Sequence, residues 1–381
     1  MNILQISPIP GYPPTSGGEQ RVHGLMKGRG QEDEVHRICH TLVGTPGIVT
    51  DQWNDIEPTY RTYRHTNYLY SAFGYLSSQY GGPPVLRSMF YQYFAPNEIA
   101  AECNWADIIV VEHPWQFRTV ERMAPDSIPV VYSSHNVETD MYKSVDLPLV
   151  NNLIYRCVRN IERYAVQNSD LVVTTTTADA DRFGELFGRN DGFHVALNGT
   201  QIPETNTEER YRVGETQVCV FVGSDHPPNR NAARHLIKIA QNGSVREADI
   251  EFAIVGSVCN GIEETPENVT LEGFVDDLTP FLAQCDIGLN PVTTGGGSNV
   301  KLAKYFAHQL PVVTTPFGAR GFPTDACIVD DIDSFGDALV EVAANERVRT
   351  ALSSKARTVA ETQLRWQQIS EELFEQLRSL I

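Results

Sequence analysis

Three consecutive glycines, 295–297, lie between an apolar run and a helical pattern, and this arrangement can bind an anion. Ser298 opens the predicted helix, whose apolar residues recur at helical spacing on one face. Glycines let the backbone approach a ligand closely, and the first N–H groups and dipole of a helix favour negative charge. Lys301 adds a positive charge in the first turn. The stretch predicts a phosphate site; the alternative is a tight strand-to-helix turn without a ligand.

The glycine loop belongs to a strand-loop-helix-strand unit. Ile287 to Asn290 reads as a buried strand, Leu310 and Pro311 end the helix, and Val312 to Thr315 supplies the next strand. In a parallel sheet such a loop lies at the carboxyl edge, where α/β folds bind ligands. The loop is not a P-loop, because GxxxxGK[ST] is absent, and it does not match GxGxxG followed by an acidic residue.

The N-terminal half repeats the same theme. The strand Ile3 to Ser7 leads through a proline-rich loop to Gly17 and Gly18, after which a helix is predicted. Two later strands end in imidazoles and carboxylates, one at Glu112-His113 and the other at His135 to Glu138. Because parallel strands end at one edge, these groups are predicted to face the ligand side of the sheet.

Strands alternate with helices throughout, so each half is predicted to contain a parallel sheet. The 381 residues are enough for two domains, and the polar segment 201–217 has the composition of a linker. We predict an N-terminal domain over 1–203 and a second domain over 204–361. The helix 362–381 has an apolar stripe, Trp366, Ile369, Leu373 and Leu377, and must pack on another element.

The net charge of −18 argues against nucleic acid as a partner and against electrostatic docking on anionic lipid. Acidic residues in excess and few lysines resemble salt-adapted proteins of haloarchaeal type; an ordinary acidic cytosolic enzyme is the alternative. The seven cysteines show no metal-ligand or disulfide spacing. No apolar run reaches membrane-spanning length and the start lacks the features of a signal peptide, so we expect a cytoplasmic protein.

An aromatic-rich region within 59–100 is the candidate for membrane or acceptor contact. No charged residue occurs from Thr66 to Leu86. Such a patch can touch an apolar acceptor or a membrane face, and the alternative is a core that packs helices. We expect at most peripheral membrane contact there.

The order and spacing of several short motifs resemble the retaining glycosyltransferases of group 1 (family 4), which have the GT-B fold. The resemblance covers essentially the whole chain and includes LQISPIP…SGGEQ, SSHNVE, VALNGT, FVGSDHPPN, LEGFVDDLTPFLAQCDIGLNP, GGGSNVK and LPVVTTPFGARG. It implies an α/β protein of two Rossmann-like, doubly wound domains facing a cleft. The first domain is implied to bind the acceptor and the second the nucleotide sugar, while the last helix crosses back to the first domain.

The resemblance also implies roles for individual residues. Gly295, Gly296, Gly297, Ser298 and Asn299 would hold the donor diphosphate, with Lys301 as its cation. Backbone at Gly223 and at Gly273, Phe274 and Val275 would line the donor site, the last three around the base. Gly17 and Gly18 would approach the donor phosphate or the acceptor, and His135 would contact the transferred sugar. No metal and no cofactor are expected, and Asp330 to Asp333 is interpreted as a solvated turn.

The sequence departs from the family at two places. The family's two glutamates, eight positions apart, correspond here to Gly296 and Lys304, so both carboxylates are missing. Lys304 can donate to donor hydroxyls or point into solvent. The family's basic pair after the first strand of the second domain corresponds to Ser224 and Asn229, and the adjacent Arg230 is a candidate to bind the phosphate instead.

Three functions remain open on this evidence. The first is transfer of a hexose from a nucleotide sugar to a glycan or lipid-linked acceptor. The second is a catalytically impaired relative that binds a glycan, a nucleotide or a partner protein, because the carboxylates and the basic pair are absent. The third is a sugar-nucleotide epimerase on the same fold.

Overall fold

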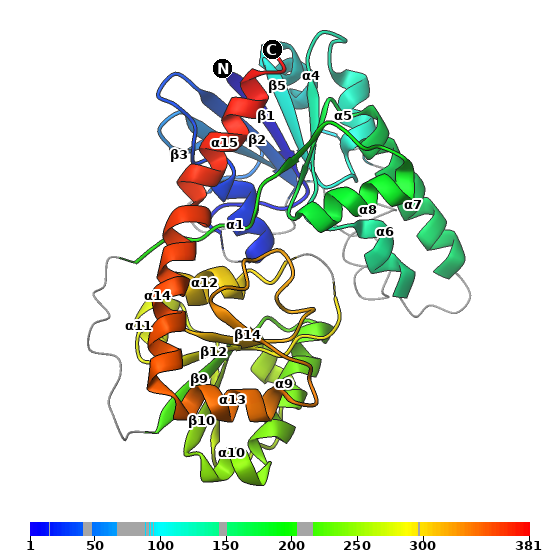
Figure 1. Cartoon of the computed structure of the whole chain (residues 1–381). Helices are drawn as coiled ribbons and strands as arrows, with labels where there is room; N and C mark the ends of the chain where they lie inside the picture. Colours follow the sequence, from blue (N-terminus) through cyan, green and yellow to red (C-terminus); the bar gives the residue numbers. More distant parts are fainter. Residues whose placement is uncertain are drawn as a thin grey trace. The chain divides into compact units, whose positions relative to one another are not determined.

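The chain forms two α/β units (Figure 1). The computed structural model describes residues 1–14, 16–40, 48–66, 88, 91, 93, 95–144, 151–203, 216–295 and 298–381. Unit 1 contains Met1–Leu197 together with Trp366–Ile381, and unit 2 contains Asn198–Arg365. This division falls before the predicted boundary at 203, and the central part of the predicted linker lies outside the described residues.

Among the described residues, unit 1 contains an eight-stranded sheet of order β3-β4-β2-β1-β5-β6-β7-β8. Its strands are β1 (Asn2–Ser7), β2 (Glu34–His40), β3 (Trp53–Glu57), β4 (Tyr60–His65), β5 (Ile108–Glu112), β6 (Val130–Ser133), β7 (Leu171–Thr174) and β8 (Phe193–Val195). Neighbouring strands are parallel except for the antiparallel pair β3 and β4. The strand order reverses between β1 and β5, so ligand-binding groups are expected at their carboxyl ends.

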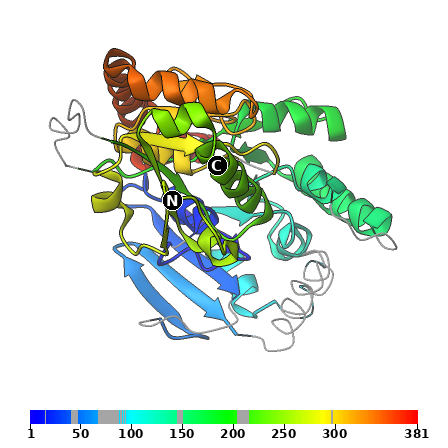
Figure 2. The same cartoon turned by 90° about the horizontal axis from the view of Figure 1, so that it is seen from below.

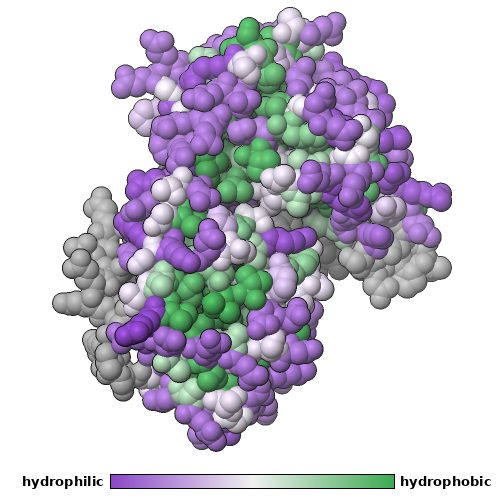
Figure 3. Space-filling view, viewed as in Figure 1, coloured by the Kyte–Doolittle hydropathy of each residue, from purple (hydrophilic) through white to green (hydrophobic). Residues whose placement is uncertain are grey.

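Side chains alternate between the two faces of the unit 1 sheet, and each face is covered by its own apolar cluster. Leu4 and Ile6 of β1 belong to one cluster, whereas Ile3 belongs to the other, which also contains Trp366. The helices of the unit are α1 (Gly17–Gly24), α4 (Glu98–Trp105), α5 (Phe117–Met123), α6 (Glu138–Met141), α7 (Asn151–Asn168), α8 (Thr177–Phe187) and α15 (Trp366–Arg378), with the 3-10 turn η1 (Tyr142–Ser144). In Figures 1 and 2, α7 lies at the outer edge of unit 1, and polar residues predominate where α7 and α8 lie (Figure 3).

Unit 2 has a wholly parallel sheet within its described residues, of order β11-β10-β9-β12-β13-β14. The strands are β9 (Gln217–Val222), β10 (Ile250–Val255), β11 (Val269–Gly273), β12 (Ile287–Asn290), β13 (Val312–Thr314) and β14 (Cys327–Val329). In chain order this is 3-2-1-4-5-6, the arrangement of dinucleotide-binding Rossmann folds, with its switch point between β9 and β12. The helices are α9 (Pro227–Ala240), α10 (Gly243–Glu247), α11 (Leu278–Leu282), α12 (Lys301–Ala307), α13 (Phe335–Ala344) and α14 (Glu346–Gln363), with the 3-10 turn η2 (Ser257–Gly261).

The C-terminal helix α15 packs on unit 1, as its apolar stripe predicts. Trp366, Ile369, Leu373 and Leu377 are all buried. The ring of Trp366 lies over Gly24, where an added Cβ would come within 2.3 Å of it, and the backbone of Glu371 lies equally close to Gly28. Glycines in and after α1 therefore permit the close approach of the two segments.

Replacing Gly24 with alanine is expected to destabilise the protein by about 1–3 kcal/mol, because the methyl group would overlap the indole of Trp366. Thermal unfolding measures the change. Gly243→Ala is the matched control, because no atom lies within 4 Å of its added Cβ. Equal unfolding temperatures for the two variants would show that α15 does not pack tightly on α1.

Candidate functional site

Lys301 is the central residue of the candidate site in unit 2. It begins α12, and Asn290, which its side chain contacts, is the last residue of β12. The ammonium Nζ donates to Asn229 Oδ1 at 2.9 Å and to Asn290 Oδ1 at 3.4 Å, and it lies 4.3 Å from the ring centroid of Phe221 on β9. The structure thus places the cation at the switch point between β9 and β12.

Further hydrogen bonds orient both amides toward this ammonium. Asn229 Nδ2 donates to the carbonyl of Ser224 at 3.1 Å, and Asn290 Nδ2 donates to the carbonyl of Gly318 at 3.0 Å. The amide nitrogens of Asn229 and Asn290 therefore point away from Lys301, and their amide oxygens are free to accept hydrogen bonds from its ammonium. The resemblance implies a lysine at position 229, where this chain has an asparagine. Asn229 instead accepts a hydrogen bond from the ammonium of Lys301, the first residue of α12.

The electrostatic environment of Lys301 favours an anionic ligand. Burial lowers the pKa of Lys301 to about 7, and no carboxylate among the described residues forms an ion pair with it. An ammonium has three donors, and two are used by the amides. The third donor has no partner among the residues that the structure describes, so an anion nearby would both accept a hydrogen bond and favour the protonated form.

Gly295, the first of the three glycines, lies against the start of α9. An added Cβ at Gly295, whose φ is 134°, would lie 3.2 Å from Pro228, and Gly296 and Gly297 lie outside the described residues. Ser298 Oγ accepts from Asn198 Nδ2 at 2.6 Å, and Asn299 Nδ2 donates to the carbonyl of Gly318 at 3.2 Å.

The predicted helix start at Ser298 is wrong, because α12 begins at Lys301. The side chains of Ser298 and Asn299 are bonded to other segments, and such residues favour non-helical conformations. The helix spans only Lys301–Ala307, so the cation rather than a long helix dipole is the principal electrostatic feature.

Gly223, Gly273, Phe274 and Val275 lie at the carboxyl ends of β9 and β11. Gly223 N donates to the carbonyl of Val255 at 2.8 Å, Gly273 has a φ of 67°, and Val275 is half-buried. The side chain of Phe274 is 74% exposed. An exposed aromatic ring at this edge offers a flat apolar surface, which is what a nucleotide base requires.

Arg230 and Lys304 lie in different surroundings from Lys301. The guanidinium of Arg230 is exposed and pairs with Asp225, and it is Asn229 rather than Arg230 that contacts Lys301. Lys304 is half-buried, and burial lowers its pKa. Its ammonium has no ion-pair partner in the described part of the chain.

Unit 1 holds a second cluster at the carboxyl ends of β1, β5 and β6. His135 Nε2 lies 2.9 Å from Glu112 Oε2, and Glu112 Oε1 accepts from Gln5 Nε2 at 2.7 Å. Burial alone would raise the pKa of Glu112, but hydrogen bonds, chiefly from His135, outweigh it and hold the pKa below its usual value. Burial and the nearby His113 lower the pKa of His135 to about 3. Glu112 is therefore ionised and His135 neutral at ordinary pH.

The tautomer of His135 follows from this pairing. A carboxylate only accepts hydrogen bonds, so His135 Nε2 carries the proton and Nδ1 is an acceptor. An added Cβ at Gly18 would lie 3.8 Å from His135 Nδ1. Gly17 and Gly18 are the first residues of α1, directly after the N-cap Ser16. Because Gly18 has no side chain, no Cβ from α1 lies in front of His135 Nδ1. Nδ1 has no hydrogen-bond partner among the described side chains.

His113 is brought together with His135, although the sequence gives it no individual role. The two rings stack with centroids 4.0 Å apart, and His113 Nδ1 lies 3.2 Å from Glu138 Oε1. His113 has a φ of 65°, a left-handed conformation that is uncommon for residues other than glycine and that is found at functional sites. The prediction that the two strand ends share one edge is confirmed, and the positive φ had no signal in the sequence.

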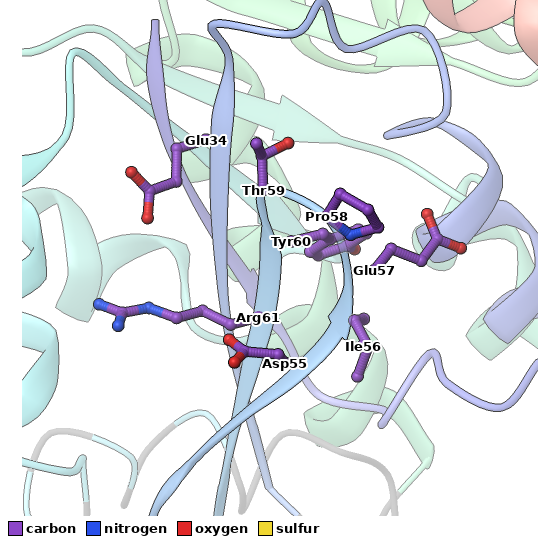
Figure 4. A pocket seen from close by; sticks show the side chains of 8 residues that line it. All are labelled: Glu34, Asp55, Ile56, Glu57, Pro58, Thr59, Tyr60 and Arg61. Atoms are coloured by element: carbon purple, nitrogen blue, oxygen red, sulfur yellow. The ribbon is translucent and has the colours of Figure 1, made fainter.

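A cavity of about 530 Å³ lies elsewhere in unit 1, beside β3 and β4 (Figure 4). Its lining residues are Glu34, Asp55, Ile56, Glu57, Pro58, Thr59, Tyr60 and Arg61. Glu34 and Tyr60 are the first residues of β2 and β4, so the cavity is at the amino ends of these strands. It is distinct from the His135 cluster, which lies at the carboxyl ends.

The described residues contain neither a metal-binding cluster nor a membrane-spanning helix. Within that part of the chain, no three His, Cys, Asp or Glu side chains gather in a way that could hold a metal ion. None of the helices there is long and apolar enough to cross a bilayer. The region 59–100 proposed for membrane contact lies in large part outside the described residues.

Two α/β units with largely parallel sheets, one of them with Rossmann strand order, are the architecture of the GT-B class. Residues 216–345 match the family described as Glycosyl transferases group 1. Compared by sequence with curated proteins, the chain has no match.

Solved structures of glycosyltransferases share the fold. Sucrose-phosphate synthase from Thermosynechococcus elongatus is 13% identical with a TM-score of 0.68, covering 100% of this chain and 99% of that one. HepE of Anabaena in complex with UDP is 15% identical with a TM-score of 0.66, covering 100% of both chains. WaaG, a glycosyltransferase involved in lipopolysaccharide biosynthesis, is 15% identical with a TM-score of 0.64, covering 99% of both. The predicted fold and the resemblance to group 1 glycosyltransferases are confirmed, and together they support a glycosyltransferase.

Proposed function

We propose that the protein is a retaining glycosyltransferase that transfers a hexose from a nucleotide sugar to a glycan or lipid-linked acceptor. The observation that carries this proposal is Lys301, a partly buried cation at the switch point of unit 2 with two oriented amides and no carboxylate partner. A diphosphate is the anion that a Rossmann switch point ordinarily binds.

In this proposal Lys301 binds the donor diphosphate and stabilises the charge that develops as the diphosphate departs. Gly295 is proposed to bring its backbone N–H group close to the same oxygens. Asn229 and Asn290 hold the ammonium in place, which reduces the reorganisation needed during the reaction. Phe274 is proposed to pack against the base, and no metal is required.

His135 is proposed to accept a hydrogen bond from a hydroxyl of the transferred sugar through Nδ1. A neutral imidazole whose Nε2 donates to an ionised glutamate is fixed as an acceptor at its other nitrogen. In the transfer, the bond between the anomeric carbon and the diphosphate oxygen breaks as the acceptor oxygen bonds to that carbon from the same face. The acceptor's proton passes to the departing diphosphate, so no protein base is consumed.

Donor chemistry in the structural relatives supports the choice of a uridine nucleotide as the first probe. HepE was solved in complex with UDP and glucose, and a further relative of 11% identity with UDP-2-fluoro glucose. These ligands belong to those proteins. For this chain, the base and the sugar are to be determined.

UDP affinity is expected to fall as the pH rises from 6 to 8.5. Lys301 is mostly protonated below its pKa of about 7 and loses its charge above it, so the anion meets a neutral amine at the higher pH. The loss is expected to be about tenfold and to be measured by titration calorimetry. The phosphate of UDP also titrates in this range, and the Lys301→Met variant reports that contribution alone. Identical profiles for the two proteins would contradict the proposal.

A catalytically impaired binding protein is the second candidate. Lys304 occupies the position where the resemblance expects a carboxylate, and it is half-buried with a pKa lowered by burial. The two functions differ in turnover, which UDP release from a panel of UDP-hexoses measures. UDP binding without release from any donor, with or without glycan acceptors, would favour the binding protein.

A further inference from the structure

A basic surface lies on α5, η1 and α7 of unit 1, in a chain whose net charge is −18. We define the α5–α7 basic surface by five exposed cations, Arg118, Arg122, Lys143, Arg156 and Arg163. Arg118 lies 5.0 Å from the ring centroid of Tyr164 on α7, so the cations of α5 and α7 adjoin one another. A cluster of positive charge on a protein with a net negative charge calls for a partner that explains it.

Three acidic residues near this surface have partners other than its five cations. Glu162 is buried, and its oxygens accept from the backbone N–H groups of Glu138 and Thr139 at 2.7 and 2.8 Å. Glu121 accepts from Tyr164 Oη at 3.0 Å, and Asp140 pairs with Arg182 at 2.7 Å. None of the five cations forms an ion pair with a residue described in the structure.

The arginines of α7 lie along one stripe of the helix. Arg156, Arg159 and Arg163 are spaced three and four residues apart, which places them on neighbouring turns of one face. Like charges at this spacing repel one another, so the stripe weakens the helix unless an anion lies beside it. Arg159 donates to the carbonyl of Leu186 at 3.3 Å, whereas Arg156 and Arg163 are exposed and form no ion pair with a described residue, so an external anion is the partner that these two would take.

An exposed apolar residue accompanies the cations. Leu153, in the first turn of α7, is 64% exposed, and the helix lies at the outer edge of unit 1 (Figures 1 and 2). A helix with basic residues and an exposed leucine matches the chemistry of a bilayer interface, where headgroups take the cations and acyl chains take the leucine. A soluble polyanion would contact the cations alone, whereas a bilayer would also contact Leu153.

We propose that the α5–α7 basic surface docks the protein on an anionic lipid bilayer. This proposal departs from the expectation that a net charge of −18 argues against docking on anionic lipid. Net charge is a poor guide for a local surface, because at physiological salt charges farther than about 8 Å from the headgroups are largely screened. The surface is separate from the 59–100 region considered in the sequence, and the proposal does not depend on the transferase activity.

The experiment is co-sedimentation of the full chain with vesicles of phosphatidylcholine alone or mixed with phosphatidylglycerol. We expect binding to the anionic vesicles only, weakening as NaCl is raised. The double variant Arg156→Gln/Arg163→Gln should bind about thirtyfold more weakly, from the loss of two charges near the headgroups. Arg234→Gln/Arg246→Gln, two exposed arginines of unit 2, is the matched charge control and should bind like the parent protein.

Leu153→Ser separates a bilayer from a soluble polyanion. It should weaken vesicle binding while leaving binding to heparin, used as the polyanion probe, unchanged. The proposal is overturned if the protein binds no vesicles, if both lipid compositions bind equally, or if the Arg156/Arg163 variant binds like the control. Heparin binding by a protein that binds no vesicles would assign the surface to soluble polyanions instead.

Discussion

Lys301→Met should weaken UDP binding by about thirtyfold at pH 6.5, because the variant removes a charge-assisted hydrogen bond to the diphosphate. The oriented oxygens of Asn229 and Asn290 would remain and would face the phosphate unfavourably. Titration calorimetry measures the loss. Lys238→Met, an exposed lysine of α9, is the control and should leave the affinity unchanged.

The same Lys301→Met variant should be more stable than the parent protein in the absence of ligand. Burial disfavours the charged form of Lys301, and an apolar side chain of similar length removes that cost, raising Tm by about 2–4 °C. The sign follows from the lowered pKa. Below about pH 7 the ammonium is protonated in both states and its cost is fully present, and the cost fades as the pH rises toward the ordinary value of 10.5. The gain in Tm should therefore be largest at low pH.

Opposite changes in binding and stability distinguish a functional lysine from a structural one. A lysine that only supported the fold would lower Tm on replacement and leave UDP affinity intact. That pair of results would remove the main support for a diphosphate site in unit 2.

Glu112→Gln is expected to lower donor turnover about 100-fold although the side chain keeps its shape. Gln5 Nε2 donates to Glu112 Oε1, so the amide oxygen of the variant must stay toward Gln5. Its NH₂ group then points at His135 Nε2 and forces the proton onto Nδ1. The nitrogen that faces the Gly18 side becomes a donor instead of an acceptor.

UDP release from the preferred UDP-hexose measures the effect of Glu112→Gln, with His135→Ala as the reference for complete loss of the imidazole. Nitrogen NMR of the histidine side chains reports the tautomer directly. UDP affinity, which depends on unit 2, should not change. If Glu112→Gln switches the tautomer yet turns over the donor like the parent protein, His135 does not accept from the sugar.

The sequence predicts most of the sheet correctly, because parallel strands buried on both faces are continuous apolar runs. Ile287 to Asn290 is found as predicted, and the Trp366 stripe is buried. The hairpin of β3 and β4 gave no such signal. Its buried residues include Thr62 and Arg64, whose polar side chains hide the strand from an apolar pattern. The edge strand β14, Cys327–Val329, is too short to be identified by pattern.

The features that can be read from the amino-acid sequence are local ones: runs of apolar residues, glycines before helices, and imidazoles and carboxylates at strand ends. Tertiary structure alone decided which of these groups meet. Asn229 contacts Lys301 because β9 and β12 are neighbours in the sheet, and Glu112 bonds to His135 because β5 pairs with β6. The direction of each hydrogen bond, and hence the near-neutral pKa of Lys301 and the tautomer of His135, depends on burial and on partners distant in the chain. These properties arise only when the strands are assembled.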